Sequence, residues 1–230
     1  MKKFTKILSI VMAMVLCVCI GVGATLAWLT DRTEEVVNTF APTKLIDPKP
    51  DPEDPDKKAG FDIWEHSAVT NADGSTSLVK ADSKKVEDLT KANTYERVQP
   101  GVDQQKDPFV RIKAQEDAYV YLEVVNNLPT SMHYTIDAAK WEQMTGKGPN
   151  GGDVYKYIGT VGEVVGYITP AMGAQDINIL DGMKVTVDPD FVAEDLTSTN
   201  TLTFFAFAAQ HAGQATAELA WTNNFAPKAA

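Results

Sequence analysis

Three histidines and an excess of carboxylates are the side chains of this sequence with the most obvious capacity for chemistry. His66, His133 and His211 lie in unrelated contexts, and none belongs to an H-E-x-x-H motif or a closely spaced pair. A zinc site needs several such ligands that converge on one ion. The sequence therefore predicts no metal site and no bound cofactor, and it indicates that the histidines lie in hairpins or on the surface.

Motifs for nucleophilic catalysis and phosphate binding are also missing from the sequence. It contains no G-x-S-x-G motif, and its two cysteines, Cys17 and Cys19, both lie in an apolar N-terminal run. The stretch Gly159–Gly162 (G-T-V-G) resembles a phosphate-binding loop only weakly, and it fits a bend better. We therefore expect a protein without catalytic residues or enzymatic activity.

The N-terminus has the three parts of an export signal. Three lysines among the first six residues precede an apolar run from Ile7 to Ile20, and small residues follow up to Ala27. The apolar run is about 14 residues long, whereas a membrane-spanning helix needs roughly 20. We predict that residues 1–27 are a signal peptide cleaved between Ala27 and Trp28; a permanent membrane anchor is the alternative.

Removal of this signal would also remove both cysteines and three basic residues. Of the 21 basic residues 18 would remain, against 31 acidic ones, so the exported chain would carry a net charge of about −13 and no thiol. A surface of that charge repels nucleic acid and anionic lipid. The composition therefore predicts no nucleic-acid partner and no disulfide in the exported protein.

The elements that position these side chains are predicted to be mostly strands. Runs of β-branched and aromatic residues with turn residues between them recur along the chain. They are Phe109–Lys113, Ala118–Asn126, Met132–Ile136, Val154–Ile158, Val164–Ile168, Asp176–Leu180, Met183–Val187, Thr201–Ala209 and Ala215–Thr222. Short helices are predicted only at Ser83–Thr90 and Ala138–Met144. Many short strands without βαβ spacing favour an all-β, antiparallel sandwich with a few short helices.

Residues 28–230 divide into three parts. Residues 28–46 are predicted to be a short strand segment, and residues 47–58 alternate proline with charge, which is typical of an extended, solvated linker. Residues 59–230 are predicted to form the sandwich domain. This domain begins with a hairpin whose tip is Asn71–Ser77.

Three groups of motifs, in order along the chain, resemble one family. The first is T-L-A-W-L-T-D (Thr25–Asp31) with N-T-F-A-P-T-K-L (Asn38–Leu45), and the second is Pro100-Gly101 with K-D-P-F-V (Lys106–Val110) ahead of A-Y-V (Ala118–Val120). The third is F-A-F-A-A-Q (Phe205–Gln210) with A-E-L-A-W (Ala217–Trp221). In these motifs the sequence is similar to the TasA/camelysin (CalY) family of biofilm matrix proteins, which are exported through the SipW signal peptidase.

The resemblance implies a jelly-roll-like sandwich that is secreted to the bacterial surface or matrix. It also implies that copies assemble head to tail into fibres, each donating an N-terminal strand to the next. The donor would run from Trp28 to Leu45, with Trp28, Val36, Phe40 and Leu45 as apolar anchors. Besides other copies, the implied partners are a signal peptidase during export and other matrix or cell-wall components.

Three alternatives remain open at this point. The segment Val36–Leu45 can be an ordinary first strand folded against its own domain. Part of the family carries a metallopeptidase label, so a camelysin-like cell-surface protease is another possibility, although the histidine spacing argues against it. A surface adhesin that does not polymerise would share the same fold and export signal.

Overall fold

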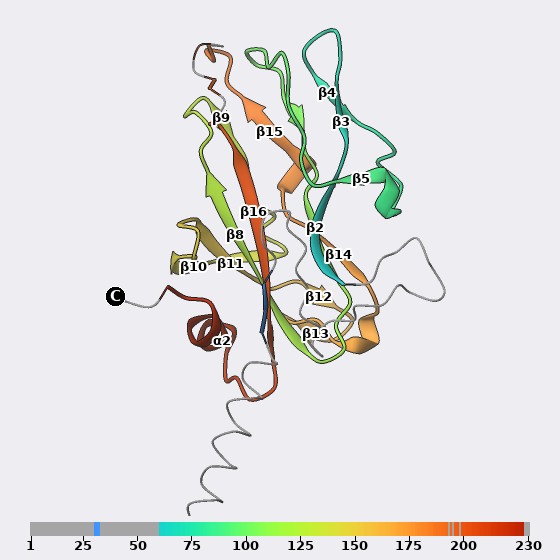
Figure 1. Cartoon of the computed structure of the whole chain (residues 1–230), viewed down its shortest axis with the longest axis vertical. Helices are drawn as coiled ribbons and strands as arrows, with labels where there is room; N and C mark the ends of the chain where they lie inside the picture. The colour runs from blue at the N-terminus through green and yellow to red at the C-terminus, as the bar shows by residue number, and fades with distance from the viewer. Residues whose placement is uncertain (1–29, 33–59, 193, 195, 198, 228–230) are drawn as a thin grey trace, which may run out of the picture.

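The computed structural model describes residues 30–32, 60–192, 194, 196–197 and 199–227. The predicted signal peptide (1–27), the cleavage site Ala27/Trp28, the anchors Val36, Phe40 and Leu45 and the linker (47–58) lie outside these residues. The described part is mostly β, as the sequence predicts (Figure 1).

The strands and helices are mostly short, and short connections join many of them. The strands are β1 (Thr30–Arg32), β2 (Phe61–His66), β3 (Ala68–Thr70), β4 (Thr76–Leu78), β5 (Leu89–Thr90), β6 (Gln104–Gln105), β7 (Phe109–Ile112), β8 (Ala118–Asn126), β9 (Met132–His133), β10 (Trp141–Lys147), β11 (Asp153–Tyr157), β12 (Thr160–Val161), β13 (Val164–Val165), β14 (Gln175–Asn178), β15 (Lys184–Val187) and β16 (Leu202–Gln210). The helical elements are the 3₁₀ turns η1 (Val86–Asp88), η2 (Pro170–Met172) and η3 (Asp181–Met183) and the α-helix α2 (Ala217–Asn224).

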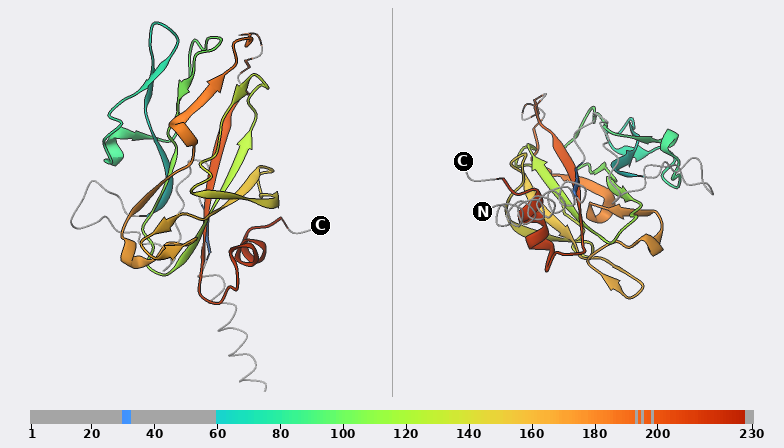
Figure 2. Two further views of the ribbon diagram at one scale, coloured as in Figure 1. Left: turned by 180° about the vertical axis from the view of Figure 1, so that it is seen from behind. Right: turned by 60° about the horizontal axis from the view of Figure 1, so that its bottom comes forward.

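Two larger sheets face each other across a shared core, as in a sandwich (Figures 1 and 2). One sheet has the order β1-β16-β8-β11-β10, and the other has the order β14-β7-β2-β5. Val120 and Leu122 of the first sheet pack against Phe61 and Val110 of the second. Three small sheets, β6-β15-β9, β3-β4 and β12-β13, complete the described part.

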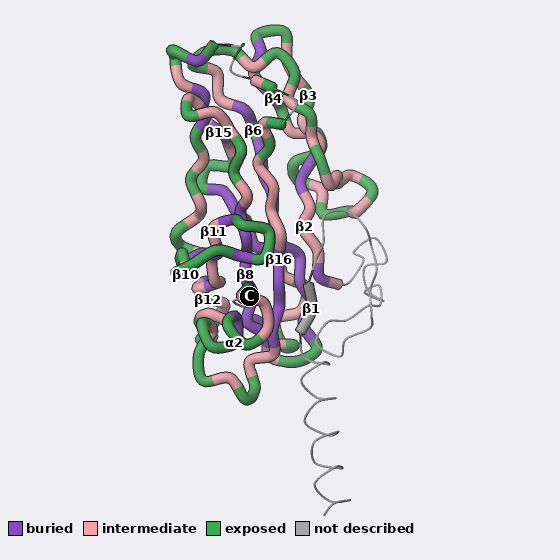
Figure 3. Tube along the Cα trace, turned by 60° about the vertical axis from the view of Figure 1, so that its left-hand side comes forward, coloured by how far each residue is buried: buried purple, intermediate pink, exposed green. Residues whose placement is uncertain are grey.

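Strand β8 is the centre of the larger sheet, and it matches its predicted range of Ala118–Asn126. Its first seven residues are buried, which fits a strand covered on both faces (Figure 3). Val120 and Leu122 lie in the core between the sheets, whereas Tyr119 and Tyr121 point to the outer face. The nearly continuous apolar run in the sequence therefore reflects burial on two sides.

The outer face is covered by α2, and the predicted strand Ala215–Thr222 is wrong. The Thr216 hydroxyl accepts a hydrogen bond from the Leu219 N–H and caps a helix that begins at Ala217. The helix buries Ala220 and Trp221 against the aromatic side chains of β8 and β16. This tertiary contact and the cap outweigh the alternating sequence pattern.

The two predicted helices are also corrected. Most of Ala138–Met144 belongs to β10, because Trp141 and Gln143 pair with Tyr157 and Tyr155 of β11. In Ser83–Thr90 only the turn η1 is helical, and β5 follows it directly. The predicted hairpin is confirmed by the pairing of β3 with β4, but its tip is shorter than Asn71–Ser77, because Thr76 and Ser77 already belong to β4.

Several predicted strands are shorter in the structure. Met132–Ile136 contracts to β9 and Val164–Ile168 to β13, and both are two residues long.

Within the described residues, no helix has the length and apolarity needed to cross a bilayer.

Candidate functional site

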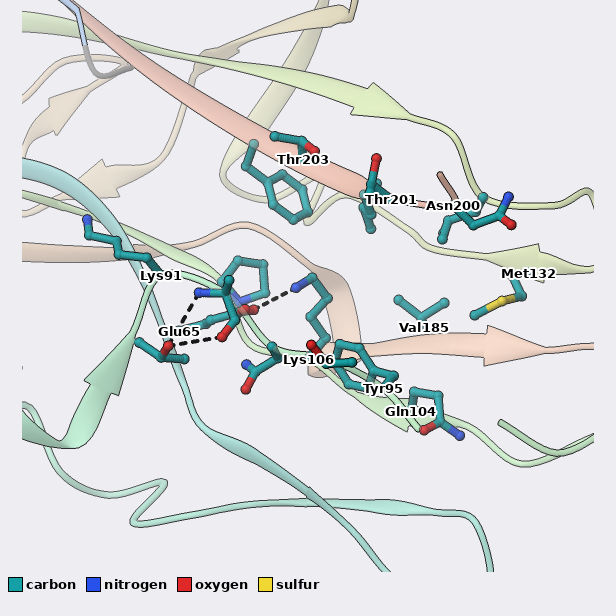
Figure 4. A pocket seen from close by; sticks show the side chains of 18 of the residues that line it. Glu65, Lys91, Tyr95, Gln104, Lys106, Met132, Val185, Asn200, Thr201 and Thr203 are labelled. Carbon is teal, nitrogen blue, oxygen red and sulfur yellow. Dashed lines mark hydrogen bonds and ion pairs between the residues drawn. The ribbon is translucent and has the colours of Figure 1, made fainter. Parts of the chain in front are cut away.

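A groove of about 560 Å³ lies between β2 and the first residues of β16 (Figure 4). One wall is built by β2 and the segment Lys91–Tyr95, and the opposite wall by Leu202–Phe204 of β16. Residues of β9 and β15 close one end. Each main sheet therefore contributes to the groove the strand that lies next to its edge strand.

Among the described residues, the first half of β16 has a strand neighbour on one side only. β16 pairs with β8 along its whole length, whereas β1 covers its other side only from Phe207 to Ala209. The Asn127 N–H donates to the Thr201 carbonyl, and the regular register makes the odd-numbered residues of β16 those that bond to β8. Leu202 and Phe204 therefore direct their N–H and C=O groups toward the groove, where no strand within the described residues pairs with them.

The edge of β2 that faces the groove has a different character. The Lys113 N–H donates to the Gly60 carbonyl, so in the same register Asp62 bonds to β7 and Ile63 turns its backbone groups away from it. The Ile63 N–H donates to Asp62 Oδ1 at 2.9 Å, and the Ile63 carbonyl accepts from Lys91 Nζ at 2.6 Å. Asp62 and Lys91 also form an ion pair. Side chains thus satisfy this backbone edge.

Lys91 is held firmly in this position. Its ammonium group lies 3.7 Å from the centroid of the Trp64 ring, in cation–π contact. Burial lowers the pKa of Lys91, and the charge of Asp62 opposes that shift. The lysine is therefore anchored by a carbonyl, a carboxylate and an aromatic ring.

The floor of the groove carries a buried ion pair. Lys106 Nζ donates to Glu65 Oε2 at 2.6 Å, and both side chains are at most 10% exposed. The lysine also lies 5.5 Å from the centroid of the Tyr95 ring (Figure 4). Burial and the charge of Glu65 raise the pKa of Tyr95, whose hydroxyl donates to the Gln105 carbonyl. These groups satisfy one another and form a fixed polar floor.

Beyond this floor the groove is mostly apolar, with one spare acceptor. Leu128, Met132, Val185 and Leu202 line this part. Gln104 is 1% exposed and donates to the carbonyls of Gly74 and Val102, but its Oε1 has no hydrogen-bond partner among the described residues. An open strand edge beside apolar pockets is the arrangement that binds extended peptides.

The histidines do not come together. His66 is 2% exposed, so the predicted hairpin or surface position is wrong for it: Nδ1 lies 2.6 Å from Asp107 Oδ2, and Nε2 lies 2.7 Å from the Ser83 carbonyl. His133 is exposed and pairs with Asp188, and the His211 ring stacks on Tyr167. Across the described ranges, no group of three or more histidine, cysteine or acidic residues is placed to hold a metal ion.

Of the predicted donor segment, only Thr30–Arg32 is described. It forms β1 on the β16 edge of its own chain, with Thr30 opposite Ala209 and Arg32 opposite Phe207. The alternative of an ordinary first strand concerns Val36–Leu45, which lies outside the described residues, so β1 does not decide between that alternative and donation. The groove residues Lys91, Glu65, Lys106 and Gln104 were not predicted from the sequence.

Comparison with known proteins gives no relative on which to base a function: no protein-family model, no curated protein and no solved structure matches the chain.

Proposed function

We propose that this protein is a secreted structural subunit of a bacterial extracellular matrix that assembles into fibres by strand addition. The N-terminal segment of one copy would pair with the open edge of β16 in the next. The sandwich would have jelly-roll-like connections, and no catalytic activity is assigned to it.

The observation that supports this proposal is the edge of β16, which the described residues cover over only part of its length. β1 occupies Phe207–Ala209, and the groove opens beside Leu202–Phe204. An added strand would satisfy the outward backbone groups of Leu202 and Phe204, while alternate side chains would enter the apolar pockets.

The direction of β1 supports a strand from this part of the chain as the occupant. A strand donated by a neighbouring copy in the same register as β1 would place its position 36 opposite Thr203 and its position 37 opposite Leu202. Both positions are valines, which favour the strand conformation. Because successive side chains point to opposite faces, Val37, opposite the groove residue Leu202, is the one that would enter the apolar pockets. A head-to-tail contact of this kind does not close on itself and propagates as a filament.

Electron microscopy and sedimentation velocity of the chain beginning at Trp28 test the proposal. We expect filaments, and we expect monomers for a chain that begins at Phe61. If both chains stay monomeric over all concentrations and pH values, the proposal is wrong. The N-terminal segment from Trp28 to Leu45 would then have no role in assembly.

A pair of variants at one position separates backbone pairing from packing. Leu202→Pro removes an outward N–H that β8 does not use, and edge strands tolerate proline at such positions. Leu202→Ala removes the same side chain but keeps the N–H. We expect filaments from Leu202→Ala and none from Leu202→Pro; equal assembly by the two variants would argue against pairing at this edge.

The metallopeptidase alternative has its own test. A casein cleavage assay with and without a chelator, together with zinc analysis of the purified protein, distinguishes it from a structural role. Chelator-sensitive cleavage by protein with stoichiometric zinc would replace the structural proposal.

A further inference from the structure

We propose that the Asp62–Lys91 pair seals the edge of β2 and so restricts strand addition to β16. The direction of this restriction rests on the proposed function, whereas the seal itself rests on the contacts of Ile63. Asp62 and Lys91 would then determine which of the two strands, β2 or β16, takes an added strand.

Two edges compete for the same groove. An exposed row of backbone donors and acceptors is a template for any extended chain, and a strand can in general add to either side. β2 and β16 both contribute residues to the groove walls. A fibre with one repeating contact requires that only one of these edges accept a strand.

Lys91 bonds to the backbone of β2 just beyond the point where the pairing with β5 ends. β5 pairs with β2 only at Glu65 and His66, so the backbone of Ile63 has no strand neighbour on that side within the described residues. Lys91 is the first residue after β5, and its side chain reaches back to the Ile63 carbonyl. Together with Asp62 on the Ile63 N–H, it makes the two hydrogen bonds that a strand would make.

The seal is costly to open. The side chains of Lys91 and Asp62 are 20% and 25% exposed, so neither charge is fully hydrated in the groove. An incoming strand would have to displace the ammonium group from the Ile63 carbonyl, from Asp62 and from the Trp64 ring at the same time. On β16, by contrast, no side chain within the described residues bonds to the outward backbone groups of Leu202 and Phe204.

Lys91→Met tests the inference because it keeps the length of the side chain and removes its charge and its donors. Asp62→Asn is a second variant, for use if Lys91→Met folds poorly. It removes the charge of residue 62 but keeps an acceptor near the Ile63 N–H. Lys184→Met is the matched control. Lys184 lies on β15, which has a strand neighbour on each side, and the substitution breaks its ion pair with Asp103.

The wild type and all variants are purified in the form that the producing cells export, with no further truncation. Hydrogen–deuterium exchange before and after assembly reports which backbone amides gain protection. In the wild type and in Lys184→Met, we expect new protection at 202–205 only. In Lys91→Met and Asp62→Asn, we expect new protection at 61–64 as well, with faster self-association.

The outcomes separate the seal from the proposed function. If the wild type stays monomeric but Lys91→Met associates through 61–64, the seal is supported and assembly at β16 is wrong. If Lys91→Met and Asp62→Asn assemble with the wild-type protection pattern, or if neither of them associates at all, the seal is wrong.

Discussion

The hydroxyl of Tyr121 donates a 2.7 Å hydrogen bond to the Ala217 carbonyl, which ties the central strand β8 to the first turn of α2. Burial raises the pKa of Tyr121, so the hydroxyl keeps its proton and remains a donor at any ordinary pH. The ring also packs against Trp221, with centroids 5.2 Å apart.

Tyr121→Phe should therefore lower the free energy of unfolding by about 1 kcal/mol, because it removes the bond and keeps the ring. Urea denaturation followed by tryptophan fluorescence measures this change. Tyr155→Phe is the control, because burial and the charge of Asp153 raise the pKa of the Tyr155 hydroxyl, and no hydrogen bond to a described residue contributes to that shift. Equal losses in the two variants would show that the bond to α2 contributes nothing of its own.

Glu123 is a second link, buried in β8 beneath the β10–β11 hairpin. Its carboxylate accepts hydrogen bonds from the Asn150 N–H at 2.8 Å, from Asn150 Nδ2 at 2.9 Å and from the Gly152 N–H at 2.9 Å. Glu123→Ala leaves these donors unpaired and should cost about 3 kcal/mol. Glu123→Gln keeps one acceptor oxygen and should cost less.

Denaturant unfolding measures both Glu123 variants, with the exposed Glu116→Ala as the control. Hydrogen exchange of the Asn150 and Gly152 amides should also accelerate in Glu123→Ala. An unchanged stability of Glu123→Ala would mean that water replaces the carboxylate at no cost.

The sequence pattern predicts a strand reliably where the strand is buried on both faces. Ala118–Asn126 is predicted correctly because its short, nearly continuous run is rich in aromatic and β-branched residues, which favours a buried strand over a helix. The stretch at Ala217–Asn224 is mispredicted because its helix depends on the Thr216 cap and on Trp221 packing against another element. Alternation alone cannot show that contact.

The groove could not be predicted for a related reason. Lys91 and the Ile63 carbonyl that it caps are 28 residues apart, and His66 and Asp107 are 41 residues apart. Nothing local in the sequence marks either pair. A weak signal exists in the charged residues Glu65, which follows Ile63 and Trp64, and Lys106, which shortly precedes the apolar start of β7, because charges so close to apolar residues are buried only when paired.

A third prediction concerns pH and the contact of α2 with β11. Lys156 Nζ lies 2.5 Å from Glu218 Oε1 and 3.3 Å from Glu142 Oε1. The hydrogen bond to Lys156 holds the pKa of Glu218 below its usual value of 4.5, and the bond to Glu218 raises the pKa of Lys156 above 10.5. A lowered carboxyl pKa stabilises the fold above pH 4.5, and that stability is lost as the pH falls through the folded value.

For Lys156 the sign is the opposite, so its contribution is present below pH 10.5 and is lost as the pH rises through its raised value. Because the Glu218 side chain is half-exposed, Glu218→Gln should cost only about 0.5 kcal/mol at pH 7. Thermal unfolding from pH 3 to 8 checks this: the difference from wild type should be constant above pH 4.5 and should shrink as the pH falls below it. A difference that stays constant down to pH 3 would exclude the ion pair as its cause.

A fourth prediction follows from the net charge. If export leaves about thirteen uncompensated negative charges on each subunit, copies repel one another at neutral pH and low salt. Assembly should therefore become stronger when acid lowers the charge or when salt screens it. Light scattering from pH 4 to 8, at low and high salt, measures this, and a flat profile in both series would remove charge repulsion from the account.

The last prediction compares two histidine–aspartate pairs that differ in burial. His66 is buried between Asp107 and the Ser83 carbonyl, and the His66 N–H also donates to Asp107 Oδ1 at 3.0 Å. His66→Phe fills most of the space but leaves the buried carboxylate with one partner fewer, which should cost about 3 kcal/mol.

His133→Phe is the matched control, because His133 is 57% exposed and its bond to Asp188 is open to water. Its stability should stay within about 0.5 kcal/mol of the wild type. Unfolding in urea at pH 7 measures both variants. A comparable loss in the two would mean that burial does not set the strength of the pair, and that the contact of β2 with the start of β7 is held mainly by the apolar core around Phe61.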